Sequence, residues 1–285
     1  MTKQVVKRMG MKEKKTMGRI ALIAFLAVIV ICTFFPYYFM IISSFKNNVE
    51  ISSQPFLMTL PIRLENYAES IGMIVKYFKN SIIISGISVC IASMISVSSA
   101  YVFARMDFPG KEFLYVFVLM FQMIPGVLTL IPQYVLVSDM KIIGTYWAAI
   151  LPFVTTAQIS FIVILRPYIE SLPNDLFEAA KLDGASGIKT FIYVAAPLIK
   201  PALTTQMLLT FLNSWNDFVW PMLTLSSNKD LKTITLGLYS FSDVQQVLYG
   251  PMFAGFVLAS VPMVLLFSLN MKSFISGITA GAVKS

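Results

Sequence analysis

The chain has 285 residues, of which 57% are hydrophobic and only 13% are charged, and its mean hydropathy is +0.76. This composition excludes an ordinary soluble domain and is typical of an integral membrane protein. The net charge of +8 favours attraction to anionic lipid over nucleic-acid binding, because the basic residues gather at the ends of apolar segments. The sequence has no histidine, which excludes histidine-based catalysis and histidine-ligated metals.

The N-terminal residues 1–19 form a basic tail, and the apolar run behind it is too long for a cleaved signal peptide. Six charge-free segments follow, at residues 20–45, 81–104, 113–137, 142–165, 202–216 and 249–271. A membrane helix needs roughly 20 residues, so we expect the short fifth segment to continue past Asp217 to Trp220. Lipid offers no partner for unpaired backbone groups. The predicted fold is therefore an all-α integral membrane protein with six transmembrane helices.

The distribution of basic residues predicts the orientation of these helices. The tail and the loops on its side of the membrane hold 15 of the 22 lysines and arginines. Because basic loops stay in the cytoplasm, both termini are predicted to be cytoplasmic, an N-in/C-in topology. Cys32 and Cys90 both lie within predicted spans, so neither indicates a disulfide framework or a metal site.

Proline and glycine mark the breaks between and within these spans. Pro109-Gly110 predicts a tight turn between the second and third spans. Within the third span, Pro125-Gly126 and Pro132 are expected to bend or break the helix; the alternatives are ordinary membrane-helix prolines and a kink that lines a cavity. In the first outer loop, residues 64–67 indicate a short interfacial helix.

The largest loop on the side of the termini, residues 166–200, is predicted to fold as a helix, a turn and a second helix. Asp175 followed by Glu178 has the spacing of a capping box at a helix start. Gly184 suits the left-handed residue that closes a helix, and Pro197 is expected to end or kink the second helix. Such helices can also be simple interfacial elements that dock on lipid, and composition alone does not separate the two.

The residues of this loop resemble those of a known family. Glu178-Ala179-Ala180, three residues, Gly184 and nine further residues before Val194-Ala195-Ala196-Pro197 resemble the EAA loop of ABC importer permeases. Val194 and Ala196 stand where the family has isoleucine and leucine. Asp183-Gly184-Ala185-Ser186 resembles the form found in carbohydrate importers. Further segments that are similar to the maltose-type second permease lie at 101–111, 145–152, 215–221 and 274–284.

The resemblance implies the transmembrane fold of type I ABC importers. Residues 20–271 would form the permease domain, with the EAA coupling loop at about 171–200, and residues 272–285 a cytoplasmic tail. The implied partners are a second permease subunit in a heterodimer, two cytoplasmic ATPase subunits, an extracytoplasmic solute-binding protein and the lipid bilayer of a prokaryotic inner or plasma membrane. No cofactor is expected on this chain, and ATP and magnesium would be bound by the partner subunits. The segment 184–190 only superficially resembles a phosphate loop, since its spacing is wrong.

By the same resemblance, one group of residues would couple to the ATPase subunits: Glu178, Ala179, Ala180, Asp183, Gly184, Ala185 and Pro197. Glu178 would pair with a basic group in a cleft of the ATPase, and the small residues would permit close approach. The alternative is that Glu178 only caps its own helix and that the alanines are plain helix formers.

A second group of polar and aromatic residues is expected to line a path for a neutral, hydroxylated substrate: Gln122, Tyr134, Thr155, Gln158, Asn213, Trp215 and Asn216. Each has a structural alternative, because amides and threonines also bridge membrane helices and tryptophans also sit at membrane interfaces. No aspartate, glutamate, lysine or arginine falls well inside a predicted span, with Asp217 the only borderline case, which disfavours an ion-coupled carrier.

These observations favour a permease subunit of an ABC importer for a di- or oligosaccharide. The alternatives are a permease for a non-sugar solute such as a glycerophosphodiester and, with less support, an ion-coupled secondary carrier. The sequence contains no nucleophile–base or metal-ligand constellation, so we expect neither a catalytic residue nor a metal site, and the chain is not predicted to be an enzyme.

Overall fold

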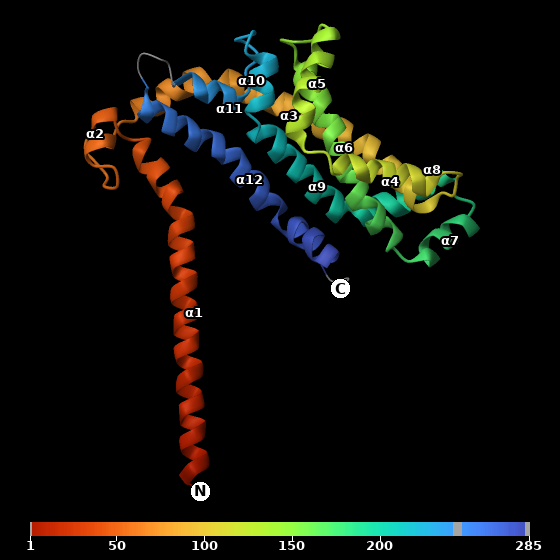
Figure 1. The fold of residues 1–285 in the computed structure, drawn as a ribbon, viewed down its shortest axis with the longest axis horizontal. Coiled ribbons are helices and arrows are strands. Elements are labelled where there is room, and N and C mark those ends of the chain that lie inside the picture. Colours follow the sequence, from red (N-terminus) through yellow and green to blue (C-terminus); the bar gives the residue numbers. More distant parts are fainter. Residues whose placement is uncertain (1, 242–246, 283–285) are drawn as a thin grey trace. The chain divides into compact units, whose positions relative to one another are not determined.

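The structure, a computed structural model, describes the backbone of residues 2–241 and 247–282 and the side chains of residues 17–72, 74–239, 241 and 247–272. Within these ranges every regular element is a helix (Figure 1). In chain order the elements are α1 (Thr2–Ser43), α2 (Asn48–Ser53), α3 (Glu65–Arg105), α4 (Lys111–Gln122), α5 (Gly126–Asp139), α6 (Tyr146–Glu170), α7 (Asn174–Leu182), α8 (Gly187–Thr190), the π-helical η1 (Phe191–Ala195), α9 (Ala196–Asn216), α10 (Val219–Leu225), α11 (Ile234–Leu238), the 3-10 turn η2 (Tyr239–Phe241) and α12 (Tyr249–Ala282).

The helices include five that are long and apolar enough to cross a membrane. They are Met17–Ser43, Ile74–Arg105, Tyr146–Glu170, Gly187–Asn216 and Tyr249–Lys272. The pair α4 and α5 passes the same test as one broken span, with a bend of 98° between its halves. The break confirms the prediction made for Pro125-Gly126, whereas Pro132 lies inside α5 without ending it. The predicted turn at Pro109-Gly110 is also confirmed, and Gly110 has a φ of 80°.

The chain divides into two compact units. The first consists of residues 1–70 and 244–257, and the second of residues 71–243 and 258–285. In the first unit, the short helix α2 is the separate helix of the outer loop, and residues 64–67 instead lead into α3, which begins at Glu65. Residues 65–67 are therefore helical as expected, but they form the first turn of α3 and not a separate short helix, because α3 starts well before its apolar part.

Helix α2 is fixed at both ends by side chains. Asn47 accepts from the amide of Glu50 and Glu50 accepts from the amide of Asn47, each at 2.8 Å, which is a capping box. Lys46, fully buried, donates from Nζ to the carbonyl oxygens of Gln54 (2.8 Å) and Pro55 at the other end. Burial lowers the pKa of the Lys46 ammonium. The outer loop is thus a folded element rather than a loose connection.

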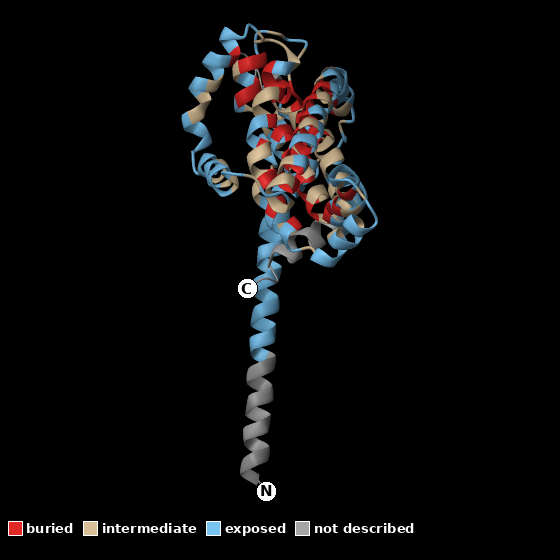
Figure 2. Cartoon of the chain, turned by 90° about the vertical axis from the view of Figure 1, so that its right-hand side faces the viewer, coloured by how far each residue is buried: buried red, intermediate tan, exposed pale blue. Residues whose placement is uncertain are grey.

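In the second unit, the core lies between α3, α6 and α9 and is rich in small residues. Ala92, Ala100, Ala149, Ala157 and Ala202 are all buried in it. Small side chains let membrane helices approach closely, where packing replaces the hydrophobic effect as the source of stability. Figure 2 shows the buried positions gathered on the bundled helices, whereas α1 is exposed along residues 17–38.

The ends of α6 show that the bent pair passes through the second unit rather than turning back. Glu112, in the first turn of α4, forms an ion pair with Arg166 near the end of α6. At the other end of α6, the connection from α5 is anchored by the Gly144 amide, which donates to the Thr224 carbonyl oxygen at 2.8 Å. The pair therefore begins beside one end of α6 and finishes beside the opposite end. This arrangement favours six crossings over five.

The fifth span differs from the prediction at both of its ends. It begins earlier, at Gly187, because residues 187–200 are helical in spite of Lys189 and Lys200. It ends at Asn216 and does not run on to Trp220, because Asp217 has an extended backbone and starts a new element. The Asp217 Oδ1 accepts from the Trp220 amide at 3.0 Å, in the first turn of α10.

Candidate functional site

The loop between α6 and α9, residues 171–195, folds as α7, a glycine turn, α8 and η1. Gly184 has a φ of 75°, which confirms its predicted left-handed conformation. The amide of Ala185 donates to the Ala180 carbonyl oxygen at 2.9 Å, and the amide of Gly184 donates to the Lys181 carbonyl oxygen at 3.1 Å. This pair of bonds is the Schellman motif. The turn after α7 is thus fixed by backbone hydrogen bonds.

The start of α7 differs from the prediction. The residue before the helix is Pro173, and no side chain caps the first turn. The capping box expected from Asp175 and Glu178 is therefore wrong, because the helix starts at Asn174, one residue before the proposed cap. Proline at this position fixes a backbone conformation that leads into a helix without using a side-chain cap.

The residues predicted to couple to ATPase subunits lie mostly on the surface. Glu178, Ala179, Asp183 and Gly184 are exposed, while Ala180 and Ala185 are half-buried. Within the described residues, Glu178 has no hydrogen-bond or ion-pair partner, so it does not act as a cap for its own helix. An exposed carboxylate without an internal partner is free to pair with a group on another chain.

Pro197 lies apart from this group, as the second residue of α9, and is exposed. The helical run does not end there, although η1 immediately before it is a π-helix in which the Ala196 amide donates to the Phe191 carbonyl oxygen. A proline cannot donate to the carbonyl four residues earlier and its ring crowds that carbonyl, and a π-turn is one way in which a helix accommodates such a defect.

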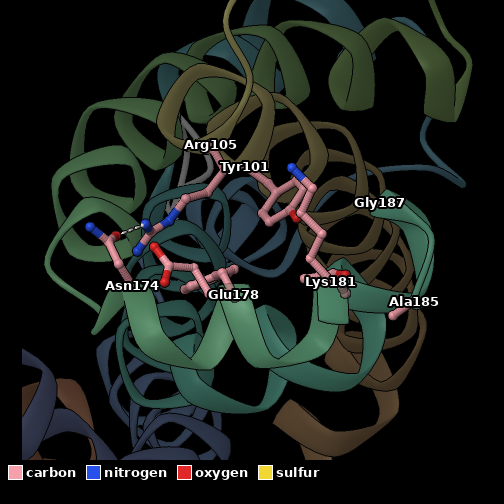
Figure 3. Close-up of a pocket in the computed structure, with 9 residues that line it drawn as sticks. Tyr101, Arg105, Asn174, Glu178, Lys181, Ala185 and Gly187 are labelled. Atoms are coloured by element: carbon pink, nitrogen blue, oxygen red, sulfur yellow. Dashed lines mark hydrogen bonds between the residues drawn. The ribbon is translucent and has the colours of Figure 1, made fainter. Parts of the chain in front are cut away.

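A pocket of about 420 Å³ opens between α7, α8 and the end of α3 (Figure 3). It is lined by Tyr101, Arg105, Asn174, Phe177, Glu178, Lys181, Ala185, Gly187 and Thr190. Figure 3 shows Glu178 of α7 and Arg105 of α3 extending into it. Of the predicted coupling residues, the pocket brings together Glu178 and Ala185.

Sequence reasoning missed Arg105 as part of this site. An arginine at the end of a span is ordinarily a sign of topology, and its partners lie 64 to 69 residues further along the chain. The sequence drew attention to Arg105 only because it lies in the segment 101–111, which resembles the permease family. That resemblance assigned no role to Arg105. Asn174 and Phe177 carried no signal of their own.

A second arginine, Arg166, lies on α6 near the same end of the second unit. It is 7% exposed, and its guanidinium bonds to Glu112 of α4 and Glu170 of α6 and lies 3.9 Å from the ring centroid of Tyr115. It therefore ties α4 to α6, and within the described part of the chain it makes no hydrogen bond or ion pair with α7. The sequence did not single it out, because α6 runs one turn beyond the predicted end of the fourth span.

The predicted substrate-path residues fall into separate places. A polar cavity of about 120 Å³ lies between α6 and α9, lined by Phe153, Thr156, Ala157, Ser160, Gln206, Thr210, Asn213 and Ser214. Asn213 is the predicted residue that lines it. Gln206 donates to the Ser160 oxygen at 2.6 Å, and neither residue was predicted, because a single glutamine or serine in a span carries no directional signal.

The other candidates do not line this cavity. Trp215 is 2% exposed and packs between Phe78 and Phe211, with ring centroids 5.5 and 5.6 Å away. Its burial shows a packing role in the structure. Four of the remaining candidates are exposed: Gln122, Tyr134, Thr155 and Asn216. The fifth, Gln158, is half-buried.

Asp217 is half-buried between α9 and α10, and burial raises the pKa of its carboxyl group. The backbone hydrogen bonds from Trp220 and Val219 act in the opposite direction. In the outer loop, the hydrogen bond from Arg63, followed by that from the Asn47 amide, lowers the pKa of Glu50. Over the described residues, no group of three or more histidine, cysteine, aspartate or glutamate side chains is placed to hold a metal.

Comparisons with known proteins agree with this architecture. Residues 92–278 match the family described as "Binding-protein-dependent transport system inner membrane component". The probable ABC transporter permease protein YurM of Bacillus subtilis (strain 168) is 31% identical, and the match covers 96% of this chain and 91% of that protein. The arabinooligosaccharides transport system permease protein AraQ of Halalkalibacterium halodurans is 33% identical, covering 93% and 94%.

Among solved structures, a chain of a bacterial ABC transporter involved in the import of the acidic polysaccharide alginate has a TM-score of 0.79 at 19% identity. The match covers 92% of this chain and 98% of that chain. This likeness confirms the predicted fold of type I ABC importer membrane subunits. The chain is an ABC permease, and it belongs to the family of inner membrane components of binding-protein-dependent transport systems.

Proposed function

We propose that this chain is one half of the translocation path of a sugar importer and that its 171–195 loop receives the movement of ATPase subunits. The observation that carries the proposal is the loop itself: α7 ends in a fixed glycine turn and presents the unpartnered carboxylate of Glu178 beside a pocket. A loop that only connects two helices requires neither a fixed glycine turn nor an unpartnered carboxylate beside a pocket.

The coupling role is assigned to seven residues: Glu178, Ala179, Ala180, Asp183, Gly184, Ala185 and Pro197. Glu178 pairs with a basic group of the ATPase, and the exposed Ala179 permits close approach of that subunit. Gly184 fixes the angle between α7 and α8. Pro197 acts at a distance from the pocket, by setting the π-turn through which the loop joins α9.

The assembly proposed for the chain follows from its family. A second permease completes the path, two ATPase subunits bind ATP and magnesium, and a solute-binding protein delivers the substrate from outside. Both termini and α7 face the cytoplasm of a prokaryote, as the basic residues indicate. Relatives and structural neighbours that carry saccharide names support a sugar as the substrate.

The proposed path runs along α6 and α9, where the polar cavity opens. All eight residues that line the cavity are uncharged, and six of them carry a hydroxyl or an amide group. Asn213, on its wall, is exposed and has no hydrogen-bond partner among the described residues. Uncharged hydrogen-bonding groups suit a hydroxylated solute and offer no cation for a phosphodiester.

The remaining candidates extend this face or flank it: Thr155 and Gln158 on α6, Asn216 at the end of α9, and Gln122 and Tyr134 on the bent pair. Trp215 supports the path from behind, since its ring is enclosed by Phe78 and Phe211.

The substrate is tested with the complete transporter in proteoliposomes. Labelled maltose, an arabinooligosaccharide, an alginate oligosaccharide and a glycerophosphodiester are offered to the binding protein, with and without ATP. The expected result is ATP-dependent uptake of at least one saccharide. Uptake of the glycerophosphodiester alone would reject the sugar assignment, and uptake by this chain without ATPase subunits would reject the whole proposal.

The coupling role is tested by Glu178→Lys. Loss of an ion pair that is buried at a subunit interface costs about 3–5 kcal/mol, so ATP-dependent uptake is expected to fall by about 100-fold or more, with normal insertion in the membrane. The matched control is Glu69→Lys, which reverses an exposed charge on α3 outside the loop. Wild-type uptake by Glu178→Lys contradicts the role of this residue.

A further inference from the structure

Arg105 joins three segments of the chain at the end of α3. Its Nη2 donates to the carbonyl oxygens of Ile169 (2.7 Å) and Leu172 (2.8 Å), where α6 ends. Its Nη1 donates to the Asn174 Oδ1 at 2.6 Å, at the first residue of α7. One guanidinium group therefore connects α3 to the end of α6 and to the start of α7.

The guanidinium also lies over the ring of Phe177, one turn further along α7, with 3.9 Å between its carbon and the ring centroid. This is a cation–π contact, which arginine makes more readily than lysine because its charge is planar. Arg105 thus holds α7 at two successive turns. A lysine has one nitrogen and reaches one of these partners well, not all four.

The carbonyl groups at the end of a helix have no partner within it, and the end carries a partial negative charge. Arg105 supplies both donors and positive charge to the end of α6, so its bonds there are charge-assisted. In contrast, α7 has no buried residue of its own. The side chains that attach it to the second unit are few, and Phe177, packed against the core, is the same ring that Arg105 covers.

We propose that Arg105 is a positioning residue: it fixes the orientation of α7 relative to α3 and α6, so that movement received by the loop is passed to the transmembrane helices and not lost by rotation of α7. The inference rests on the proposed coupling role of the loop. It adds a device that connects α7 to α3 and α6, and Arg105 lines the same pocket as the coupling residues Glu178 and Ala185.

The first test measures solute transported per ATP hydrolysed by the complete transporter, with the saccharide that the wild type takes up. Arg105→Gln and Arg105→Lys are expected to lower this ratio by about 2- to 30-fold, the range over which single residues modulate coupling. Lysine keeps the positive charge, so Arg105→Lys is expected to have a higher ratio than Arg105→Gln, although still below that of the wild type. Asn174 is exposed, and Asn174→Ala removes only one of the acceptors of Arg105. This variant is therefore expected to lower the ratio less than the Arg105 variants do.

Arg166→Lys is the matched control, because Arg166 lies at the same end of the second unit and ties α4 to α6. It is expected to lower the melting temperature without changing the ratio. A wild-type ratio in both Arg105 variants overturns the proposal, as does an equal loss in Arg166→Lys. If Glu178→Lys is inactive while the Arg105 variants are normal, the positioning role fails and the proposed function stands.

The second test does not depend on transport. Spin labels are placed at Leu182→Cys on α7, which is 89% exposed, and at Lys200→Cys on α9, with Cys32 and Cys90 replaced by serine. The distance distribution between the labels is expected to broaden when Arg105 is changed to glutamine and to stay narrow in Arg166→Lys. An unchanged distribution in Arg105→Gln, in a complex that still assembles, overturns the proposal.

Discussion

Asp217 carries the half-buried carboxylate at which the fifth span ends. Burial raises its pKa, so the folded state binds a proton there more tightly than the unfolded state does. Above the raised pKa the ionised group costs stability, and that cost disappears as the pH falls through it. Asp217→Asn removes the charge and keeps an oxygen for the Trp220 amide.

We therefore expect Asp217→Asn to have a melting temperature equal to or above that of the wild type at pH 7. The difference is expected to shrink between pH 7 and pH 4, as the wild-type carboxyl group with its raised pKa gains a proton. Thermal unfolding followed by tryptophan fluorescence at both pH values measures this. A variant that is clearly less stable at pH 7 shows that the hydrogen bonds to the carboxylate outweigh its burial.

Single residues were predictable where the backbone demanded them. Gly184 and Pro125-Gly126 were identified correctly, because a left-handed turn and a missing amide are local properties. Arg105 was not, because its role depends on carbonyl groups that only the folded chain brings near. The cap expected at Asp175 was also wrong. Pro173 sets the start of α7 at Asn174, so Asp175 lies inside the helix and its side chain does not cap it.

Close helix packing in the second unit leads to a prediction for α11. Gly237 is buried there, and a Cβ added to it would lie 2.1 Å from the Tyr77 ring. Gly237→Ala must displace that ring, and overpacking of this kind costs about 1–3 kcal/mol. Unfolding of the purified complex in denaturant measures the loss.

The matched control is Gly86→Ala on α3, where an added Cβ meets nothing within 4 Å. Replacing glycine by alanine within a helix is worth roughly 0.5–1 kcal/mol, so this variant is expected to be as stable as the wild type or more so. Equal stability of the two variants contradicts the close approach of α11 to α3.

At the scale of helices, apolar length predicted the spans well and their ends poorly. The fifth span begins 15 residues earlier than predicted, at 187 in place of 202, because its first turns carry lysines on an otherwise helical segment. A segment can be helical without being apolar, so hydropathy alone does not show where this helix begins. The helix expected at 64–67 belongs to α3 and is not separate, because α3 extends beyond its membrane-crossing part.

For the whole molecule, the number of crossings decides on which side each loop lies. Val49 on α2 and Leu182 on α7 are 74% and 89% exposed. Three spans separate them if the bent pair crosses the membrane, and two if it turns back. Each residue is changed to cysteine, with Cys32 and Cys90 replaced by serine.

An impermeant maleimide is expected to label Val49→Cys in intact cells and Leu182→Cys only after permeabilisation, because six crossings put the two on opposite sides. Labelling of both in intact cells would show that α4 and α5 form a re-entrant pair. The opposite pattern, with Leu182→Cys alone labelled from outside, would reverse the N-in topology that the basic residues predict.

The all-helical class and the division into spans were available from composition and hydropathy alone, because the bilayer permits few alternatives. The family was available from the loop residues and their spacing. The sequence did not predict which polar side chains contact one another across helices. The α6–α9 cavity, for example, requires Gln206 and Ser160 to lie at the same level of the two helices. Such meetings depend on helix rotation, which apolar segments leave undetermined.

The π-turn η1 makes chain length itself a structural variable. It holds one residue more than an α-helical turn requires, and each residue of an α-helix turns the chain by about 100°. Removing a residue from 191–195 would relax the turn to ordinary α-helix and swing everything before it round the axis of α9. Insertions and deletions in that five-residue window would therefore re-aim the loop, even where every side chain named above is retained.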